Sequence, residues 1–296
     1  MVQAGEGESA LVRLTSAAGG GPLRLDQVSA VYELAGHVQR GEVGLTETAH
    51  RLLAILVMRP LFGTITLTLG LGVLSAGVAL ALQPTLLGVV GAFVLGTLVG
   101  CALLIRVPEL QAVMPVAVSF WVATVVFLLA EHHGGENPNR SLIPPLVIFL
   151  PGAAITTRTM ELAAGQTISG ASRLVEGLMV LLLLAFGIIA AVAALVGAPS
   201  VDLIDRPFDQ LGSWTTVLAL VVIALGNHLH LCAPRRAVPW ILLVLAVASA
   251  GQAFGAAVFS AELSTFVGAL AMTPLVLLIG RRRAGPPSMV LFLPVF

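Results

Sequence analysis

The phrase PPLVIFLP, at residues 144–151, returns as PSMVLFLP at residues 287–294. The two copies share proline, valine, phenylalanine, leucine and proline at five matching positions. Each copy lies in an apolar segment that prolines interrupt. In membrane proteins, interrupted segments at corresponding positions of two halves point to the binding site of a secondary transporter. The repeated phrase, which we call the proline phrase, therefore predicts a transporter built from two related halves.

The composition is typical of a membrane protein. Of the 296 residues, 57% are hydrophobic and 10% are charged, and the mean hydropathy is +1.01, well above that of ordinary soluble domains. All 15 basic residues are arginines, and 15 acidic residues balance them. Because there is no net basic charge to attract phosphates, we expect no binding to nucleic acid. Cys101 and Cys232 show no metal-ligand spacing, so we expect neither a metal nor a cofactor.

A membrane-spanning helix needs about 20 consecutive apolar residues. The chain contains nine apolar runs, of which the fourth is short and carries Pro144, Pro145, Pro151 and Gly152. We therefore expect an all-α polytopic membrane protein with a broken fourth helix. The predicted spans cover residues 61–82, 85–105, 112–130, 142–155, 174–196, 214–231, 238–254 and 263–279, and a ninth begins at residue 286 and is cut off at residue 296.

The two halves can be overlaid along the chain. Pro84 follows the first span and Pro234 follows the sixth, 150 residues later, while the proline phrase returns after 143 residues. Each repeat then holds five spans, and because five is odd, the second repeat must enter the membrane from the opposite side. We expect two five-helix repeats in inverted topology, with about nine spans present and the tenth missing. The predicted parts are a short cytoplasmic helical lead-in at 1–58, a first repeat at 59–198, an acidic outer loop at 199–211 and a truncated second repeat at 212–296.

Arginine placement predicts the orientation. Inner loops of membrane proteins carry an excess of basic residues. If the N-terminus is cytoplasmic and the broken fourth segment crosses, the outer loops receive only Arg140 and Arg206. The charge pattern therefore predicts a multi-pass protein with a cytoplasmic N-terminus. The arginines at the inner ends are Arg51, Arg59, Arg106, Arg158, Arg173, Arg235, Arg236, Arg281, Arg282 and Arg283.

The polar lead-in has a helical pattern of its own. Apolar residues from Leu25 to Val38 recur at helical spacing. A turn from Gly41 to Gly44 separates this helix from a second one, which Thr46 is expected to cap. The lead-in is therefore predicted to be a helical hairpin that packs on the membrane domain.

The second span carries a stripe of small residues. Gly88, Ala92, Gly96 and Gly100 recur every four residues and so lie on one helical face. Small residues let neighbouring helices approach closely in a membrane. We interpret the stripe as a packing face.

The stretch from Pro151 to Gly187 is the densest cluster of glycine, small hydroxyl and charged residues beside lipid. Proline and glycine within a span free backbone groups, which are tolerated only inside protein or beside a cavity. An amino acid could use such groups, because its carboxylate suits a helix N-terminus and its ammonium suits carbonyl oxygens. The alternative is a plain kink that serves packing. The candidate substrate-binding residues are Pro151, Gly152, Thr156 and Thr157, with Pro294 from the second proline phrase.

Two pairs of opposite charges follow the break. Arg158 and Glu161, like Arg173 and Glu176, lie three residues apart and can pair along a helix. Glu176 falls in the first turns of the fifth span, where an ionisable side chain is a candidate for proton coupling. The alternative is a salt bridge that anchors the helix at the interface. We take all four as candidate coupling or gating residues.

Asn227, His228 and His230 end the sixth span. A spacing of two puts the histidines on different helical faces, unlike the i, i+4 pair of a metal site. These side chains either hold the helix end at the membrane surface or relay protons. We take Asn227 and His228 as further gating candidates.

Other classes of function compete with transport. An intramembrane enzyme needs a nucleophile with a base, or metal ligands, and the sequence contains no GxSxG or HExxH motif. We therefore expect no enzymatic activity. A non-transporting membrane scaffold or regulatory subunit stays open, because packing stripes alone would suffice for it.

A known family shows a similar series of residues. The proline phrase is followed in order by Thr156, Leu162, Gly165, Ser169-Gly170, Arg173-Leu174 and Glu176. Together with the lead-in at 24–56, the stretch PRRAVPW at 234–240 and the closing LFLP, these residues resemble the threonine/serine exporters, the ThrE family. The resemblance implies export of small polar amino acids such as threonine and serine across the plasma (inner) membrane. It also implies protons as the coupling ions, in a bilayer-embedded protein for which a homo-oligomer stays open.

Two departures from that family are visible. Family members have further sequence ahead of the lead-in and continue through a tenth span, so this chain is expected to be clipped at both ends. In the second copy, Val295 stands where the first copy has Gly152. The two breaks therefore differ at the glycine position.

Overall fold

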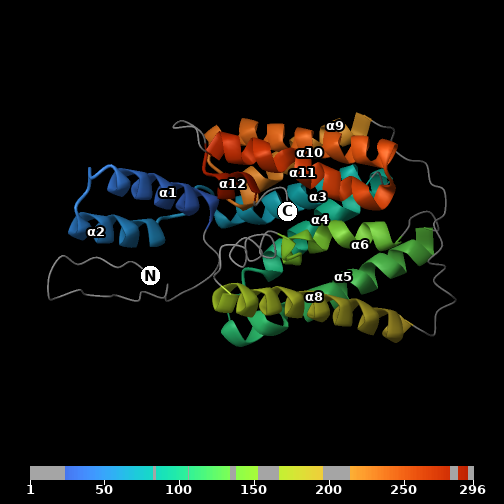
Figure 1. The fold of residues 1–296 in the computed structure, drawn as a ribbon. Coiled ribbons are helices and arrows are strands. Elements are labelled where there is room, and N and C mark those ends of the chain that lie inside the picture. Colours follow the sequence, from blue (N-terminus) through green and yellow to red (C-terminus); the bar gives the residue numbers. More distant parts are fainter. Residues whose placement is uncertain are drawn as a thin grey trace.

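The computed structural model describes residues 24–82, 85–105, 107–133, 138–152, 167–195, 214–280 and 286–292. Over these ranges the chain is all-helical, as predicted (Figure 1). The elements are α1 Leu25–Gln39, α2 Leu45–Leu56, α3 Thr64–Ala81, α4 Leu86–Ala102, α5 Pro108–His133, α6 Pro138–Leu146, η1 Val147–Phe149, α8 Thr167–Leu195, α9 Trp214–His230, η2 Arg235–Ala237, α10 Val238–Val258, α11 Ala261–Gly280 and α12 Ser288–Phe292.

Five of the described helices are long and apolar enough to cross a membrane. Three shorter apolar helices accompany them, at Leu86–Ala102, Arg140–Phe149 and Trp214–His230. The all-α prediction is therefore confirmed over the described residues, and these candidate spans fit a multi-pass membrane protein, while the number of spans stays a prediction. The five long segments are Thr64–Ala81, Glu109–Ala130, Leu174–Leu195, Arg235–Val258 and Ala261–Gly280.

Helices α3 and α9 touch backbone to backbone. A Cβ placed on Gly70 would lie 2.7 Å from the backbone nitrogen of His230, and one on Gly77 would lie 2.8 Å from that of Ile223. Gly226 forms the same kind of contact from the α9 side. Residue numbers rise along α3 as they fall along α9, so the two helices are antiparallel. We call this contact the α3–α9 seam.

The small-residue stripe of α4 lies against α3. A Cβ on Gly96 would come within 2.6 Å of the Cβ of Ser75, and one on Gly100 within 3.1 Å of the Cα of Thr68. The Thr68 hydroxyl donates to the carbonyl of Ile65, one turn earlier (2.8 Å). The prediction that the stripe is a packing face is therefore confirmed.

The two halves of the chain are not packed alike. In the first half α4 lies along α3, whereas in the second half α10 lies along α11. Glycines again mark the contact, because a Cβ on Gly251 would lie 3.0 Å from the Cα of Gly268. A Cβ on Gly255 would lie 2.9 Å from the Cα of Ser264. Glycines therefore lie at the close helix contacts α3–α9, α3–α4 and α10–α11.

Two hydrophobic cores hold the helices together. The first lies among α3, α4, α5, α6 and α8 and includes the buried side chains of Val122 and Leu146. The second lies among α9, α10, α11 and α12, and it includes Ile241 and Leu291. Leu25 of α1 also belongs to the second core, with 1% of its surface exposed. The lead-in is therefore packed into the second half of the chain.

The lead-in folds as the predicted helical hairpin of α1 and α2, which projects from one end of the helical bundle (Figure 1). Gly41 has a φ of +70° and ends α1 in a Schellman motif, in which the N–H of Glu42 donates to the carbonyl of His37 (3.1 Å). The prediction that Thr46 caps α2 is wrong. The chain is already helical at Leu45, so Thr46 lies inside the first turn rather than at the extended position that a cap requires.

Candidate functional site

The broken fourth helix is present at the predicted place. Helix α6 ends at Leu146, a single 3-10 turn follows to Phe149, and Leu150 is extended, with φ −69° and ψ 116°. The N–H of Leu150 donates to the carbonyl of Val147 (3.2 Å). A residue that precedes proline is pushed toward extended conformations by the proline ring, so Pro151 explains why the helical turn stops here.

The segment that leads to the break lies among packed helices, whereas Leu150 at the break is 40% exposed. Helix α6 contacts α3, α4 and α5, and η1 contacts α3 and α8. The side chains of Leu142 and Leu146 are 6% and 4% exposed, and Pro144 is fully buried. Backbone that departs from a regular helix within a membrane is tolerated where protein surrounds it. A helix end in such a place offers carbonyl groups to a polar ligand.

The predicted site residues have different fates in the structure. Pro151 and Gly152 are half-buried at the break. Glu176 is exposed on α8, and Arg173 lies on the same helix. The remaining predicted residues of the break and of the charged pairs lie outside the described part of the chain: Thr156, Thr157, Arg158, Glu161 and Pro294.

The end of α9 is tied to its surroundings rather than free at a membrane surface. Asn227 is 2% exposed. The Nδ1 of His228 hydrogen-bonds the carbonyl of Ala233, and its ring meets the ring of Phe62 edge-on, with centroids 5.1 Å apart. The Nδ1 of His230 hydrogen-bonds the carbonyl of Leu67 on α3 (2.9 Å). Both rings must donate from Nδ1 in these contacts, because a carbonyl oxygen can only accept.

A polar network that the sequence reasoning missed joins α1 to α2. The side-chain amide of Gln27 donates to the carbonyls of Ile55 and Leu56 (3.0 and 3.2 Å), and its oxygen accepts from the N–H of Arg24 (3.1 Å). The last carbonyls of a helix need donors from outside the helix. Gln27 supplies one to each of these two carbonyls, and that of Ile55 also accepts from the N–H of Met58 (3.2 Å).

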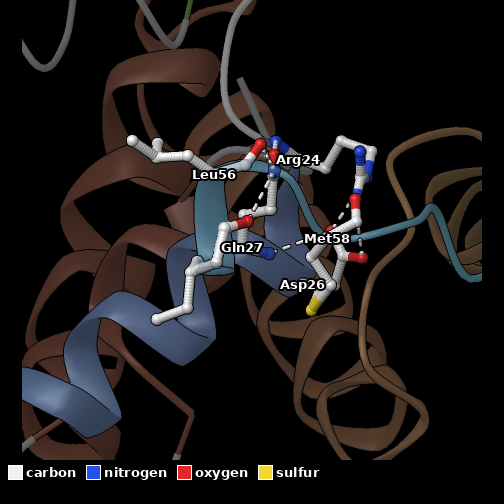
Figure 2. Close-up of polar contacts among 6 residues, drawn as sticks. Arg24, Asp26, Gln27, Leu56 and Met58 are labelled. Atoms are coloured by element: carbon white, nitrogen blue, oxygen red, sulfur yellow. Dashed lines mark hydrogen bonds and ion pairs between the residues drawn. The ribbon is translucent and has the colours of Figure 1, made fainter. Parts of the chain in front are cut away.

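Arg24 and Asp26 complete this network, which we call the polar latch (Figure 2). The guanidinium of Arg24 donates to the carbonyl of Met58 (2.8 Å) and to the carboxylate of Asp26 (3.1 Å). Asp26 and Gln27 are 6% and 5% exposed. The sequence carries no distinct signal of this burial, because polar residues between apolar ones three apart are the usual pattern of an amphipathic helix.

Cys232 lies beside the latch. Its side chain is fully buried, and its φ of 54° is unusual for a residue other than glycine. Burial, helped by the negative charge of Asp26, raises the pKa of the thiol above its ordinary value, although the backbone N–H groups of Leu61 and Phe62 hydrogen-bond to it. The thiol is therefore neutral and shielded from solvent.

Among the residues that the structure describes, no cluster of three or more His, Cys, Asp or Glu side chains could hold a metal ion. Over the described part of the chain, the polar groups that gather are backbone carbonyls, an amide, an ion pair and imidazoles.

Comparison with known proteins identifies the family. The family model described as "Putative threonine/serine exporter", ThrE, matches residues 6–195, more than half of the chain. That range contains the hairpin, the first core and the broken fourth helix. No curated protein and no solved structure matches the chain. The chain therefore belongs to the ThrE family of threonine/serine exporters.

Proposed function

We propose that this protein exports small polar amino acids, threonine and serine first, across the plasma membrane and draws on the proton motive force. The family supports the substrate class. The observation that carries the proposal is the break at Leu150–Pro151: the α6–η1 segment that leads to it packs against α3, α4, α5 and α8, and Leu150 itself is 40% exposed. An interrupted helix inside a bundle is the kind of place where secondary transporters bind their substrates.

We assign the substrate to both proline phrases. Pro151 and Gly152 would contribute the break itself, Thr156 and Thr157 hydroxyl groups just after it, and Pro294 the second copy. An amino acid carries its ammonium and carboxylate groups on the same carbon, so it needs an acceptor for the one and a donor for the other within a few ångströms. A helix that stops and restarts provides both, because carbonyls end one piece and N–H groups begin the next.

The antiparallel α3–α9 seam supports the inverted repeat. These two helices are the first of their repeats, and the 150-residue offset makes Leu74 equivalent to Ala224. A Cβ on Gly226 would lie 2.5 Å from the Cα of Leu74. The observed contact is thus within two residues of the pairing that a two-fold axis between the repeats would give. The unlike packing of α4 and α10 limits this symmetry to the seam.

We assign proton coupling and gating to charged residues on or before α8 and to polar residues at the end of α9. Glu176 lies on α8, the helix that contacts η1 beside the break, and would carry the proton. Arg173, on the same helix, and the pair Arg158 and Glu161 would influence whether Glu176 is protonated. The tied end of α9, with Asn227 and His228, would control access at the hairpin end of the bundle.

Exposed arginines support the orientation with the hairpin in the cytoplasm. Arg51 lies on α2, Arg59 just before α3, and both Arg235 and Arg236 on η2. All four belong to the end of the bundle that carries the hairpin, because α3 begins and α9 ends there (Figure 1). Basic residues gather on the cytoplasmic side of membrane proteins.

Efflux of labelled threonine tests the proposal. Cells without their own threonine exporter are loaded with labelled threonine, and efflux is compared with and without the protein. We expect the protein to speed efflux and Gly152→Leu to return it to the background rate, because a leucine side chain would fill the space at the break. The matched control is Gly91→Leu, since a Cβ at Gly91 on α4 meets no atom within 4 Å.

Two outcomes would count against the proposal. Unchanged efflux on expression of the wild-type protein would favour a non-transporting scaffold or regulatory subunit. Normal efflux by a well-expressed Gly152→Leu protein would show that the break is only a kink.

A further inference from the structure

The second proline phrase rests partly on the lead-in helix. Helix α12, which begins within this phrase, has Val290 and Leu291 fully buried and Phe292 9% exposed. Its packing partners among the described helices are α10, α11 and α1. From α1, Leu25 and Val28 join the same core, with 1% and 8% of their surfaces exposed. A helix outside the predicted spans therefore forms one wall around a segment of the proposed substrate site.

Helix α1 is fixed at this place by its first turn. The N–H of Leu25 donates to the carbonyl of Leu231, at the end of α9 (3.1 Å). The polar latch holds the next residues to the end of α2, with Gln27 donating to two carbonyls there (Figure 2). The first turn of α1 is thus bonded to α2 on one side and to the α9 loop on another, while its apolar side chains meet α12.

The latch is costly to open partway. Asp26 and Gln27 are nearly buried, and a buried polar group that loses its partner is strongly unfavourable. The carbonyl of Leu56 would also lose the donor that Gln27 supplies if Gln27 withdrew, whereas that of Ile55 would keep the N–H of Met58. The first turn of α1 therefore keeps one position as long as the latch is intact. Helix α12 then keeps α1 as a packing partner.

We propose that Gln27 is a positioning residue for transport: through the first turn of α1, it sets the place of α12 and so of the half-site contributed by the second proline phrase. The inference rests on the proposed function, because it assigns α12 to the substrate site. It makes the cytoplasmic hairpin part of the transport unit.

Cys232 provides a reporter that does not depend on transport. It is fully buried beside the latch, where Asp26 and Arg24 lie close enough to influence its thiol. The other cysteine of the chain, Cys101, is exposed and can be replaced by serine. In a Cys101→Ser protein, the rate of reaction of Cys232 with N-ethylmaleimide then measures how often the junction between α1, the α2–α3 linker and α9 opens.

The test compares Gln27→Ala with Gln39→Ala in the Cys101→Ser background. Both are glutamines of α1, but Gln39 is exposed at the far end of the helix. We expect Gln27→Ala to speed labelling of Cys232 about tenfold, as the loss of buried hydrogen bonds implies. In inverted vesicles, we also expect it to raise the half-saturating threonine concentration by roughly threefold or more, since a displaced α12 weakens binding. Gln39→Ala should change neither quantity.

Each other result overturns the inference. A lower maximal rate at an unchanged half-saturating concentration would mean that Gln27 only helps folding. A changed half-saturating concentration with Cys232 still protected would mean that the effect does not pass through the junction. If Gln27→Ala is not recovered as folded protein, Arg24→Gln, which removes the Met58 contact at a partly exposed position, must show the same two changes at smaller amplitude. Absent threonine transport by the wild type would refute the proposed function, whereas normal wild-type transport with an unaffected Gln27→Ala protein would refute this inference alone.

Discussion

Gly226 lies against the backbone of α3 with no room for a side chain. A Cβ there would come within 2.5 Å of the Cα and 2.6 Å of the nitrogen of Leu74. Both atoms belong to a helix backbone, which cannot turn aside as a flexible side chain can. Replacing the glycine therefore requires the two helices to separate.

We predict that Gly226→Ala destabilises the protein by about 1–3 kcal/mol, the usual cost of overpacking. Gly91→Ala is the control, because open space surrounds that position and alanine favours a helix over glycine by about 0.5–1 kcal/mol. The measurement is the midpoint of thermal unfolding in detergent. Equal midpoints for the two variants would contradict the close contact at the α3–α9 seam.

Individual residues were predictable when their effect is local. Pro151 stops a helical turn by its own ring, and Gly41 takes a left-handed conformation that its neighbours do not need to impose. Gln27 was not predictable in this way. Its partners, the carbonyls of Ile55 and Leu56, are nearly 30 residues away and are made available by the end of another helix.

At the scale of elements, the turn between α1 and α2 carries a charge cluster. Hydrogen bonds from Arg40 and then His37 lower the pKa of Glu42 from its ordinary value of 4.5 to about 2. A carboxyl group whose pKa is lower in the folded state stabilises that state above the unfolded pKa. The contribution is therefore complete above pH 4.5 and is lost as the pH falls toward 2.

We predict that the amide groups of this turn, such as the Glu42 N–H bonded to His37, exchange faster relative to their intrinsic rates as the pH falls through this window. Glu42→Gln should remove the pH dependence and leave the faster exchange at all pH values. Glu33→Gln, on the exposed face of α1, is the control. A wild-type turn with the same protection at pH 2.5 and pH 5 would show that the cluster has no influence on the hairpin.

The positions of the helices followed well from apolar runs, but their ends did not. Helix α5 extends from Pro108 through His133, beyond the predicted run at 112–130, because polar residues can continue a helix that leaves the apolar layer. Helix α2 begins at Leu45 without a capping side chain from Thr46. Hydropathy reports where a segment is apolar, whereas hydrogen bonds decide where a helix begins and ends.

At the scale of the whole molecule, the orientation can be tested at the hairpin. The turn at residues 40–44 is largely exposed. A protease recognition sequence inserted after Glu42 should be cut in inverted vesicles and protected in right-side-out vesicles, because the hairpin is proposed to be cytoplasmic. The same sequence inserted in the predicted outer loop at 199–211 should show the opposite pattern. Cleavage of both from one side would contradict the inverted repeat.

Helix pairing was the least predictable part of the fold. In lipid, apolar faces carry no preference for one another, so hydropathy does not reveal which helices touch. The stripe on α4 correctly indicated a close contact, but not that α3 would be the partner. Gly70, Gly77 and Gly226 bring the backbones of α3 and α9 even closer, although only two of them, seven residues apart, lie on one helix and form no continuous stripe.

The α3–α9 seam also constrains how the protein can move. If one helix slid along the other by a single residue, a rise of about 1.5 Å, the glycines would leave their places and bulky side chains would meet bare backbone. The seam therefore resists sliding of α3 along α9. It permits only rotation or tilting of one helix against the other. Along the chain, α4 meets α5 and α9 meets α10 over little surface. We therefore expect any large rearrangement to occur at the α4–α5 and α9–α10 contacts, while α3 and α9 stay packed together.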